Sequence, residues 1–139
     1  MINNRISWRK NVSLLGLIAA LAFGASLYAQ DRDDRWVFLG SRHVDGGHDH
    51  DVVQVGSRDG KFHAVQLRVT GGAVDFHRVI VHFGNGTSEE IAFRERIPDG
   101  GRTRPIELPG ERRIIRNVEL WYGKESWIHR PKVEVFGIR

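Results

Sequence analysis

The stretch from Val74 to Gly86 constrains the fold most, because apolar residues alternate along it and a turn signal ends it. Val79, Val81 and Phe83 recur at every second position, and this period of two predicts a strand with one buried face. The dipeptide Asn-Gly at positions 85 and 86 then predicts a tight hairpin turn. The sequence therefore places a core strand in this stretch and a chain reversal directly after it.

An irregularity in this stretch recurs later in the chain. The apolar pattern jumps by three from Phe76 to Val79, which predicts a β-bulge or a short bend at the two residues between them. The stretch 115–123 has the same spacing, displaced by 39 residues. The match indicates either an internal repeat of a bulged strand or a coincidence between two such strands. If the two copies are equivalent, His82 and Trp121 occupy equivalent outward positions.

Short apolar runs separated by glycine, proline and aspartate continue along the rest of the chain. They predict further strands at 36–40, 52–55, 62–70, 91–93, 106–108, 114–122 and 133–138. No segment outside the N-terminus has a convincing helical period. About eight short strands with regular turn signals predict an all-β fold, a single-domain antiparallel β-sandwich, with a small closed barrel as the alternative.

The first 29 residues have the pattern of a signal peptide. Three basic residues precede an apolar stretch at 12–23, and small residues follow at the expected cleavage site. We expect cleavage after Ala29, so that residues 1–29 are the signal peptide and residues 30–139 form the β-sandwich domain. The alternative is retention as an N-terminal membrane anchor, because the residue three before this cut is a large one, Leu27. Either reading predicts a periplasmic or secreted protein.

Most of the positive charge belongs to this leader. The formal net charge is +4, and removal of its three basic and no acidic residues leaves +1 (4 − 3) on the domain. A nucleic-acid-binding domain usually keeps a strong basic excess, so we expect no nucleic-acid partner. The chain has no cysteine, which excludes a disulfide, a thiol nucleophile and a Cys-ligated metal.

Several of these motifs together resemble a family of small exported bacterial proteins that is described only as a domain of unknown function. The resemblance covers nearly the whole mature chain and lies in Trp36-x-x-Leu39-Gly40, Asp51-Val52-Val53-x-Val55-Gly56, Val79-x-Val81-x-Phe83-x-Asn85-Gly86, Gly100-Gly101-Arg102-x-Arg104-x-Ile106-x-Leu108-x-Gly110 and the strand from Arg113 to Tyr122. These are mostly strand and turn positions. The resemblance therefore implies a fold and export, and it assigns no catalytic residue.

A loop rich in histidine and aspartate is the first candidate site. It contains His43, Asp45, His48, Asp49, His50 and Asp51. Imidazole nitrogens and carboxylate oxygens are ordinary ligands of zinc, nickel and copper, so a divalent transition metal is the cofactor that this loop suggests. Among these residues, His43, His48, His50 and Asp49 are the predicted ligands. The alternative is a solvated loop that is polar because it lies outside.

Arginines and aromatic residues form the second candidate site. Seven arginines lie between Arg94 and Arg116, and the predicted ligand-binding residues are Arg102, Arg104, Trp121 and Trp127. Guanidinium groups and indole rings bind anionic or sugar-like ligands through bidentate hydrogen bonds and stacking. In the alternative interpretation, the acidic residues of the same segment pair with these arginines across strands.

His63, His77 and His82 lie on predicted strands, and no enzyme motif accompanies them. His63 shares its parity with inward residues and is predicted to be a hydrogen-bonded core histidine, whereas His82 is predicted to be exposed. The sequence has no nucleophile elbow, zinc-protease helix or phosphate loop. We therefore expect a non-enzymatic module that binds an envelope component or a protein partner, with a metal-binding protein and a hydrolase with an unrecognised site as alternatives.

Overall fold

The computed structural model describes residues 35–139, and the expected signal peptide lies outside the described residues. The strands are β1 (Trp36–His43), β2 (Asp49–Gln54), β3 (Lys61–Phe62), β4 (Ala64–Thr70), β5 (Val74–Phe83), β6 (Ser88–Ile91), β7 (Arg96–Ile97), β8 (Ile106–Glu107), β9 (Arg113–Lys124) and β10 (Lys132–Ile138). One 3-10 turn, η1 (Ser57–Asp59), separates β2 from β3. The described part is thus all-β, as predicted, and β3 and β7 are short strands that the sequence pattern did not reveal.

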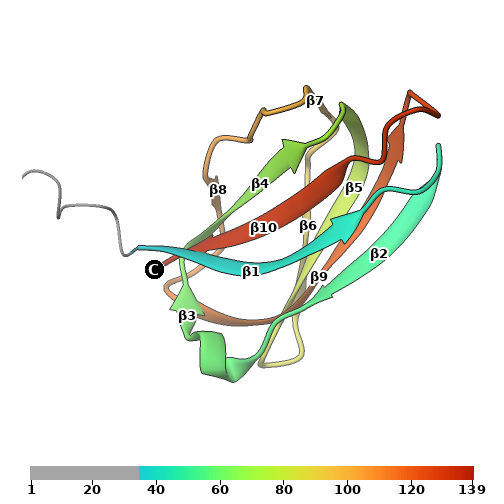
Figure 1. The fold of residues 1–139 in the computed structure, drawn as a ribbon. Helices are drawn as coiled ribbons and strands as arrows, with labels where there is room; N and C mark the ends of the chain where they lie inside the picture. Colours follow the sequence, from blue (N-terminus) through green and yellow to red (C-terminus); the bar gives the residue numbers. More distant parts are fainter. Residues whose placement is uncertain (1–34) are drawn as a thin grey trace, which may run out of the picture. The chain divides into compact units, whose positions relative to one another are not determined.

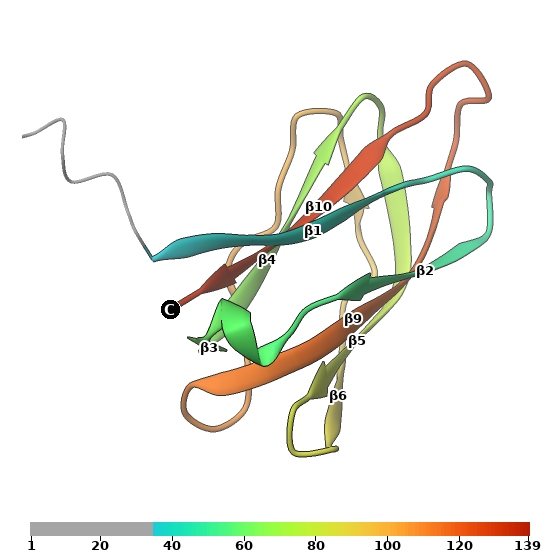
Figure 2. The same cartoon turned by 60° about the horizontal axis from the view of Figure 1, so that its bottom comes forward.

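The strands form two antiparallel sheets that pack face to face (Figures 1 and 2). One sheet, sheet A, has the order β1-β10-β4-β8. The other, sheet B, has the order β2-β9-β5-β6, with β3 paired to β9 and β7 paired to β5. Neither sheet closes on itself, so the protein is a β-sandwich, and the alternative of a closed barrel is wrong. Within residues 35–139 no helix is long and apolar enough to span a membrane.

The core lies between the sheets and comes from the alternating positions. The fully buried side chains on sheet B include Val79, Val81 and Leu120, and those on sheet A include Leu67 and Val135. Removal of such side chains from water is the main stabilising term in folding, worth roughly 1.5–3 kcal/mol each. Within the described residues, the buried hydrophobic side chains form one core cluster that runs from Leu39 to Val135.

The two bulged stretches seen in the sequence are neighbouring strands. β5 pairs with β9 from Val74 opposite Lys124 to Phe83 opposite Ile115. The register shifts once between Phe76 and Arg78, and once more where Phe83 follows His82. The first shift confirms the bulge predicted in β5, and the second places an extra residue in β9, where the same jump of three occurs. Each strand therefore contributes one bulge, at opposite ends of the pair.

The hairpin after β5 is present and has a three-residue loop. The amide of Gly86 donates to the carbonyl of Phe83 at 3.1 Å, and the amide of Phe83 donates to the carbonyl of Thr87 at 2.8 Å. Gly86 has a φ of 86°, which a residue with a side chain rarely adopts, whereas no residue other than glycine has a positive φ in the described part. Within this loop the positive φ is confined to the last position, as in the common three-residue hairpin loop.

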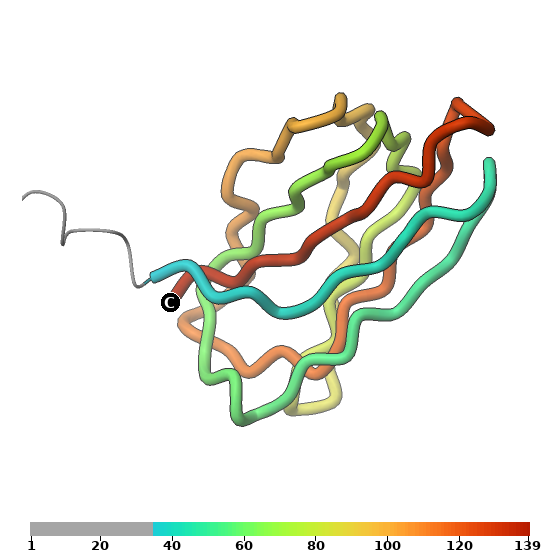
Figure 3. The backbone as a smooth tube through the Cα atoms, in the orientation of Figure 1, coloured from blue at the N-terminus to red at the C-terminus, as the bar shows by residue number. Residues whose placement is uncertain are grey.

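Loops gather at the two ends of the sandwich. Figure 3 shows that the connections after β1 and after β9 meet at the end opposite the start of β1. The amide of Val44 donates to the carbonyl of Pro131, and the amide of Lys124 donates to the carbonyl of Gly46. The His/Asp loop and the β9–β10 loop therefore form one structure, which we call the loop end (residues 44–48 and 125–131).

Candidate functional site

A row of four side chains crosses the outer face of sheet B. His50 on β2 lies opposite Trp121 on β9, and Trp121 lies opposite Arg78 on β5. The imidazole of His50 stacks on the indole with ring centres 4.2 Å apart and planes 10° apart. The guanidinium carbon of Arg78 lies 5.1 Å from the indole centre. Arg78 also donates to both carboxylate oxygens of Glu90 on β6, at 2.9 and 3.0 Å. We call these residues the Trp121 row.

The Trp121 row limits how the indole can bind a ligand. Because β2 and β5 flank β9, His50 and Arg78 approach the ring from opposite sides. The stacking and cation–π contacts hold all three side chains in these positions. A planar ligand could stack on Trp121 only by displacing one of these two side chains.

Glu119 lies beside this row and joins two histidines. Its carboxylate lies 3.4 Å from Nε2 of His50 and 3.1 Å from Nε2 of His82. The side chains of Glu119 and His82 are about a quarter exposed, at 26% and 24%, so His82 is less exposed than the sequence predicts. The three residues come from three neighbouring strands and hold them together on the solvent side.

Among residues 35–139, no group of three or more His, Cys, Asp or Glu side chains is placed where it could hold a metal ion.

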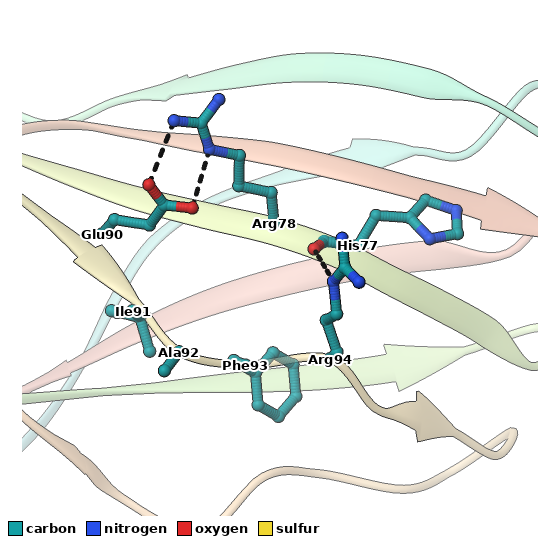
Figure 4. Close-up of a pocket in the computed structure, with 7 residues that line it drawn as sticks. All are labelled: His77, Arg78, Glu90, Ile91, Ala92, Phe93 and Arg94. Carbon is teal, nitrogen blue, oxygen red and sulfur yellow. Dashed lines mark hydrogen bonds and ion pairs between the residues drawn. The ribbon is translucent and has the colours of Figure 1, made fainter.

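A pocket of about 320 Å³ opens at the edge of sheet B beside this row (Figure 4). It exists because β6 ends at Ile91 and β7 begins only at Arg96, so the chain between them leaves β5 at the bulge. Its lining consists of His77, Arg78, Glu90, Ile91, Ala92, Phe93 and Arg94. A second hollow, of about 410 Å³, is lined by Asp75, Phe76, His77, Arg94, Glu95 and Arg96. We call the two together the Arg94 groove.

The three arginines of the Arg94 groove differ in whether a carboxylate pairs with them. Arg78 is held by Glu90, and Arg96 pairs with Glu125 at 2.7 Å. Arg94 donates from Nε to the backbone carbonyl of His77 at 3.3 Å, and no carboxylate of the described residues forms an ion pair with it. The Arg94 side chain is thus an exposed cation without an ion-pair partner among the described residues, in a groove that Asp75, Glu90 and Glu95 also line.

The predicted metal ligands are spread over the end of β1, the loop end and β2. His43 is exposed at the end of β1, and the ring of His48 lies 5.7 Å from that of His77. The carboxylate of Asp49 accepts hydrogen bonds from the amides of Asp45 and His50. His50 belongs to the Trp121 row. A metal site in this loop stays a prediction.

Asp45 braces the loop end. Its carboxylate lies 2.6 Å from Nε of Arg130, and this hydrogen bond holds the pKa of Asp45 below its usual range. Trp127 lies on the same β9–β10 loop, with 85% of its surface exposed. Trp127 is therefore near the His/Asp loop rather than near Trp121.

The predicted ligand-binding residues do not form one cluster. Arg102 lies opposite Arg68 on sheet A, and Arg68 packs its guanidinium 3.9 Å from the ring centre of Phe136 on the outer face of that sheet. Arg104 is exposed in the connection before β8. Arg102 and Arg104 share the connection between β7 and β8, Trp121 lies on sheet B and Trp127 lies at the loop end, so the four predicted positions fall in three places.

His63 differs from its prediction. It is hydrogen-bonded, at 3.1 Å to Glu107, but its side chain is 39% exposed and lies outside the core. The reason is the break between β3 and β4, which removes His63 from the alternation of the following strand.

Sequence reasoning missed the partners that complete the sheet B face. Arg78, Glu90, His77 and Glu119 were not singled out as functional. The alternation along the two bulged strands was the signal that could have found them. It places Arg78, His82, Glu119 and Trp121 on the outer face once β5 and β9 are paired.

Comparison with known proteins gives one match. A family model described as Domain of unknown function (DUF2541) matches residues 16–137. No curated protein and no solved structure matches the chain. The match covers both sheets, the Trp121 row and the Arg94 groove. The chain therefore belongs to the DUF2541 family of domains of unknown function.

Proposed function

We propose that this protein is an exported, non-enzymatic binding module that takes an anionic ligand, such as an acidic sugar of the cell envelope, in the Arg94 groove. The observation that carries the proposal is the cation of Arg94, which has no carboxylate partner among the described residues and lines both hollows. A guanidinium presents planar donors that match carboxylate and phosphate oxygens.

The rest of the groove suits a ligand with both polar and apolar surface. Ile91 and Phe93 contribute half-buried apolar side chains, and Phe93 packs against Phe76 with ring centres 5.5 Å apart. His77 adds an exposed imidazole. Binding sites of this kind combine apolar lining with a few placed polar groups. A sugar ring that bears a carboxylate or a phosphate has this combination of surfaces.

Two features support a binding role rather than catalysis. Glu90, the carboxylate of the first pocket, is held by both donors of the Arg78 fork and is already engaged as a counter-ion. The His–carboxylate pairs at His63 and His82 lie on exposed faces and do not line the groove. Export is supported by the leader pattern of residues 1–29.

Thermal unfolding of residues 30–139 with acidic sugars tests the proposal. A ligand that binds the folded state at ten times its Kd stabilises it by about 1.4 kcal/mol. For a domain of this size that raises the melting temperature by roughly 6 °C. We expect such a rise with glucuronate, galacturonate or sugar phosphates, and none with glucose.

The control is a matched pair of arginine variants. Arg94→Gln should abolish the rise, whereas Arg104→Gln, an exposed arginine outside the groove, should keep it. An equal response in the two variants would exclude the groove as the site. No response of the parent protein to any anion would overturn the binding proposal.

A further inference from the structure

The β9–β10 loop ends in two exposed apolar residues. Trp127 is 85% exposed and Ile128 is 90% exposed, and they are adjacent in the sequence. Among the described residues, the other large apolar side chain that is strongly exposed is Phe38, at 53%, on sheet A. Single exposed apolar residues are ordinary on protein surfaces, but a tryptophan and an isoleucine together at a loop tip form an apolar projection.

The base of this loop is held by contacts on both sides. The Arg130–Asp45 ion pair and the hydrogen bond from Val44 to Pro131 fix it to the His/Asp loop. The ammonium of Lys124 donates to the carbonyl of His129 at 3.1 Å and closes the loop across its base. These contacts lie below the tip, so the fold presents Trp127 and Ile128 outward instead of covering them.

One cation that is unpaired among the described residues, Lys124, lies at the base of the tip, whereas Arg130 pairs with Asp45 and Glu125 pairs with Arg96. Lys124 donates to a carbonyl and has no ion-pair partner among residues 35–139. His129 and Arg130 directly follow the apolar pair, and Arg130 is about 63% exposed at its side chain. Apolar tip residues with cations at their base are the pattern of segments that bind at the surface of a lipid bilayer.

We infer that the loop end docks on a lipid bilayer through Trp127 and Ile128. A stable protein interface needs about 800 Å² from each partner, roughly 20–30 residues, and a projecting tip with two apolar side chains does not supply such a surface. A bilayer interface deforms around a projection, and it favours tryptophan because the ring is apolar and carries one polar N–H.

Docking at this end would also orient the Arg94 groove. Glu125, on the same loop, pairs with Arg96, which lines the second hollow of the groove. A docked tip therefore brings the groove close to the headgroup layer. The inference does not depend on the proposed ligand, because the tip and Arg94 are separate side chains that separate variants remove.

Vesicle co-sedimentation tests the inference. The protein is residues 30–139, which contain the compact unit Arg35–Arg139 and lack the apolar stretch 12–23 that would bind lipid by itself. The vesicles are phosphatidylethanolamine with phosphatidylglycerol at a ratio of about 3:1, and phosphatidylcholine alone. We expect binding to both, stronger to the anionic vesicles, with a blue shift of tryptophan emission that Trp127→Phe removes.

Two variants decide the outcome. The double variant Trp127→Ser with Ile128→Ser should weaken vesicle binding about tenfold or more. The loss of only part of one buried apolar side chain already weakens binding about tenfold, and this variant removes two such side chains. Phe38→Ser removes the exposed apolar residue of sheet A and should change binding less than about twofold. Binding that survives the double variant, or a parent protein that binds neither kind of vesicle, would overturn the inference. Arg94→Gln should leave vesicle binding intact, which separates this test from that of the groove.

Discussion

Trp121 and Trp127 are six positions apart in the chain and lie in opposite environments. Trp121 lies on a strand between His50 and Arg78, and a planar ligand can stack on its ring only by displacing one of them. Trp127 stands at a loop tip with 85% of its surface exposed. The same residue type therefore stabilises the fold in one place and is free to bind in the other. The difference is that neighbouring strands provide cross-strand partners and a loop tip does not.

The largest expected effect concerns Gly123, which lies between the two tryptophans in the sequence and lets the His/Asp loop pack closely on β9. A Cβ at Gly123 would collide with the backbone carbonyl of Gly47. Gly123→Ala should therefore lift the loop from β9 and lower the free energy of unfolding by about 2–3 kcal/mol. Urea denaturation measures this. Gly47→Ala is the matched control, because open space surrounds that position, and an equal loss in both variants would contradict the steric argument.

Trp121→Ala should have the next largest effect. The substitution removes the stacking on His50 and the contact with Arg78, and a loss of about 2 kcal/mol in the free energy of unfolding is expected. The measurement is again urea denaturation, with Trp127→Ala beside it. If both variants lose the same stability, the contrast between the two tryptophans is wrong.

A smaller effect is expected at Tyr122, the inward neighbour of Trp121. Its hydroxyl donates to the Asp51 carboxylate at 2.7 Å, and burial followed by this hydrogen bond raises the pKa of Tyr122 far above its usual value. Tyr122→Phe should cost about 1 kcal/mol at neutral pH, since it leaves Asp51 without this donor.

The same pKa shift predicts a loss of stability in alkali. In the unfolded chain tyrosine loses its proton near pH 10, whereas folded Tyr122 keeps it. The contribution is therefore complete below about pH 10 and declines as the pH rises above that value. Denaturation curves between pH 8 and 11 should show a steeper decline for the parent than for Tyr122→Phe, and parallel declines would refute the assignment.

The smallest effect on stability is expected for Trp127→Ala, less than about 0.5 kcal/mol, because the side chain loses little contact on truncation. The same variant should have a large effect on vesicle binding. A variant that melts like the parent but no longer sediments with lipid would show that Trp127 serves binding and not stability. A large drop in melting temperature would show that Trp127 packs on the domain and would remove the contrast.

The longer strands, both bulges and the turn after β5 could be predicted from the sequence alone. Burial on one face imposes a period of two on a strand, so Val79, Val81 and Phe83 had to lie inward wherever the strand was placed. The jump at His77 and the glycine at position 86 are local features, and local spacing reveals them. The same reasoning failed at His63, because a short break between strands resets the alternation.

The contacts between outward-facing side chains of different strands depend on the tertiary structure. His50 and Glu119 are 69 positions apart, and they touch because β2 pairs with β9 in one particular register. The Arg94 groove exists because β6 and β7 leave a gap beside the bulge of β5, which no pattern within either segment encodes. Alternation specifies a face, whereas strand order and register specify neighbours. Sites that consist of neighbours from distant segments therefore become visible only after the sheets have formed.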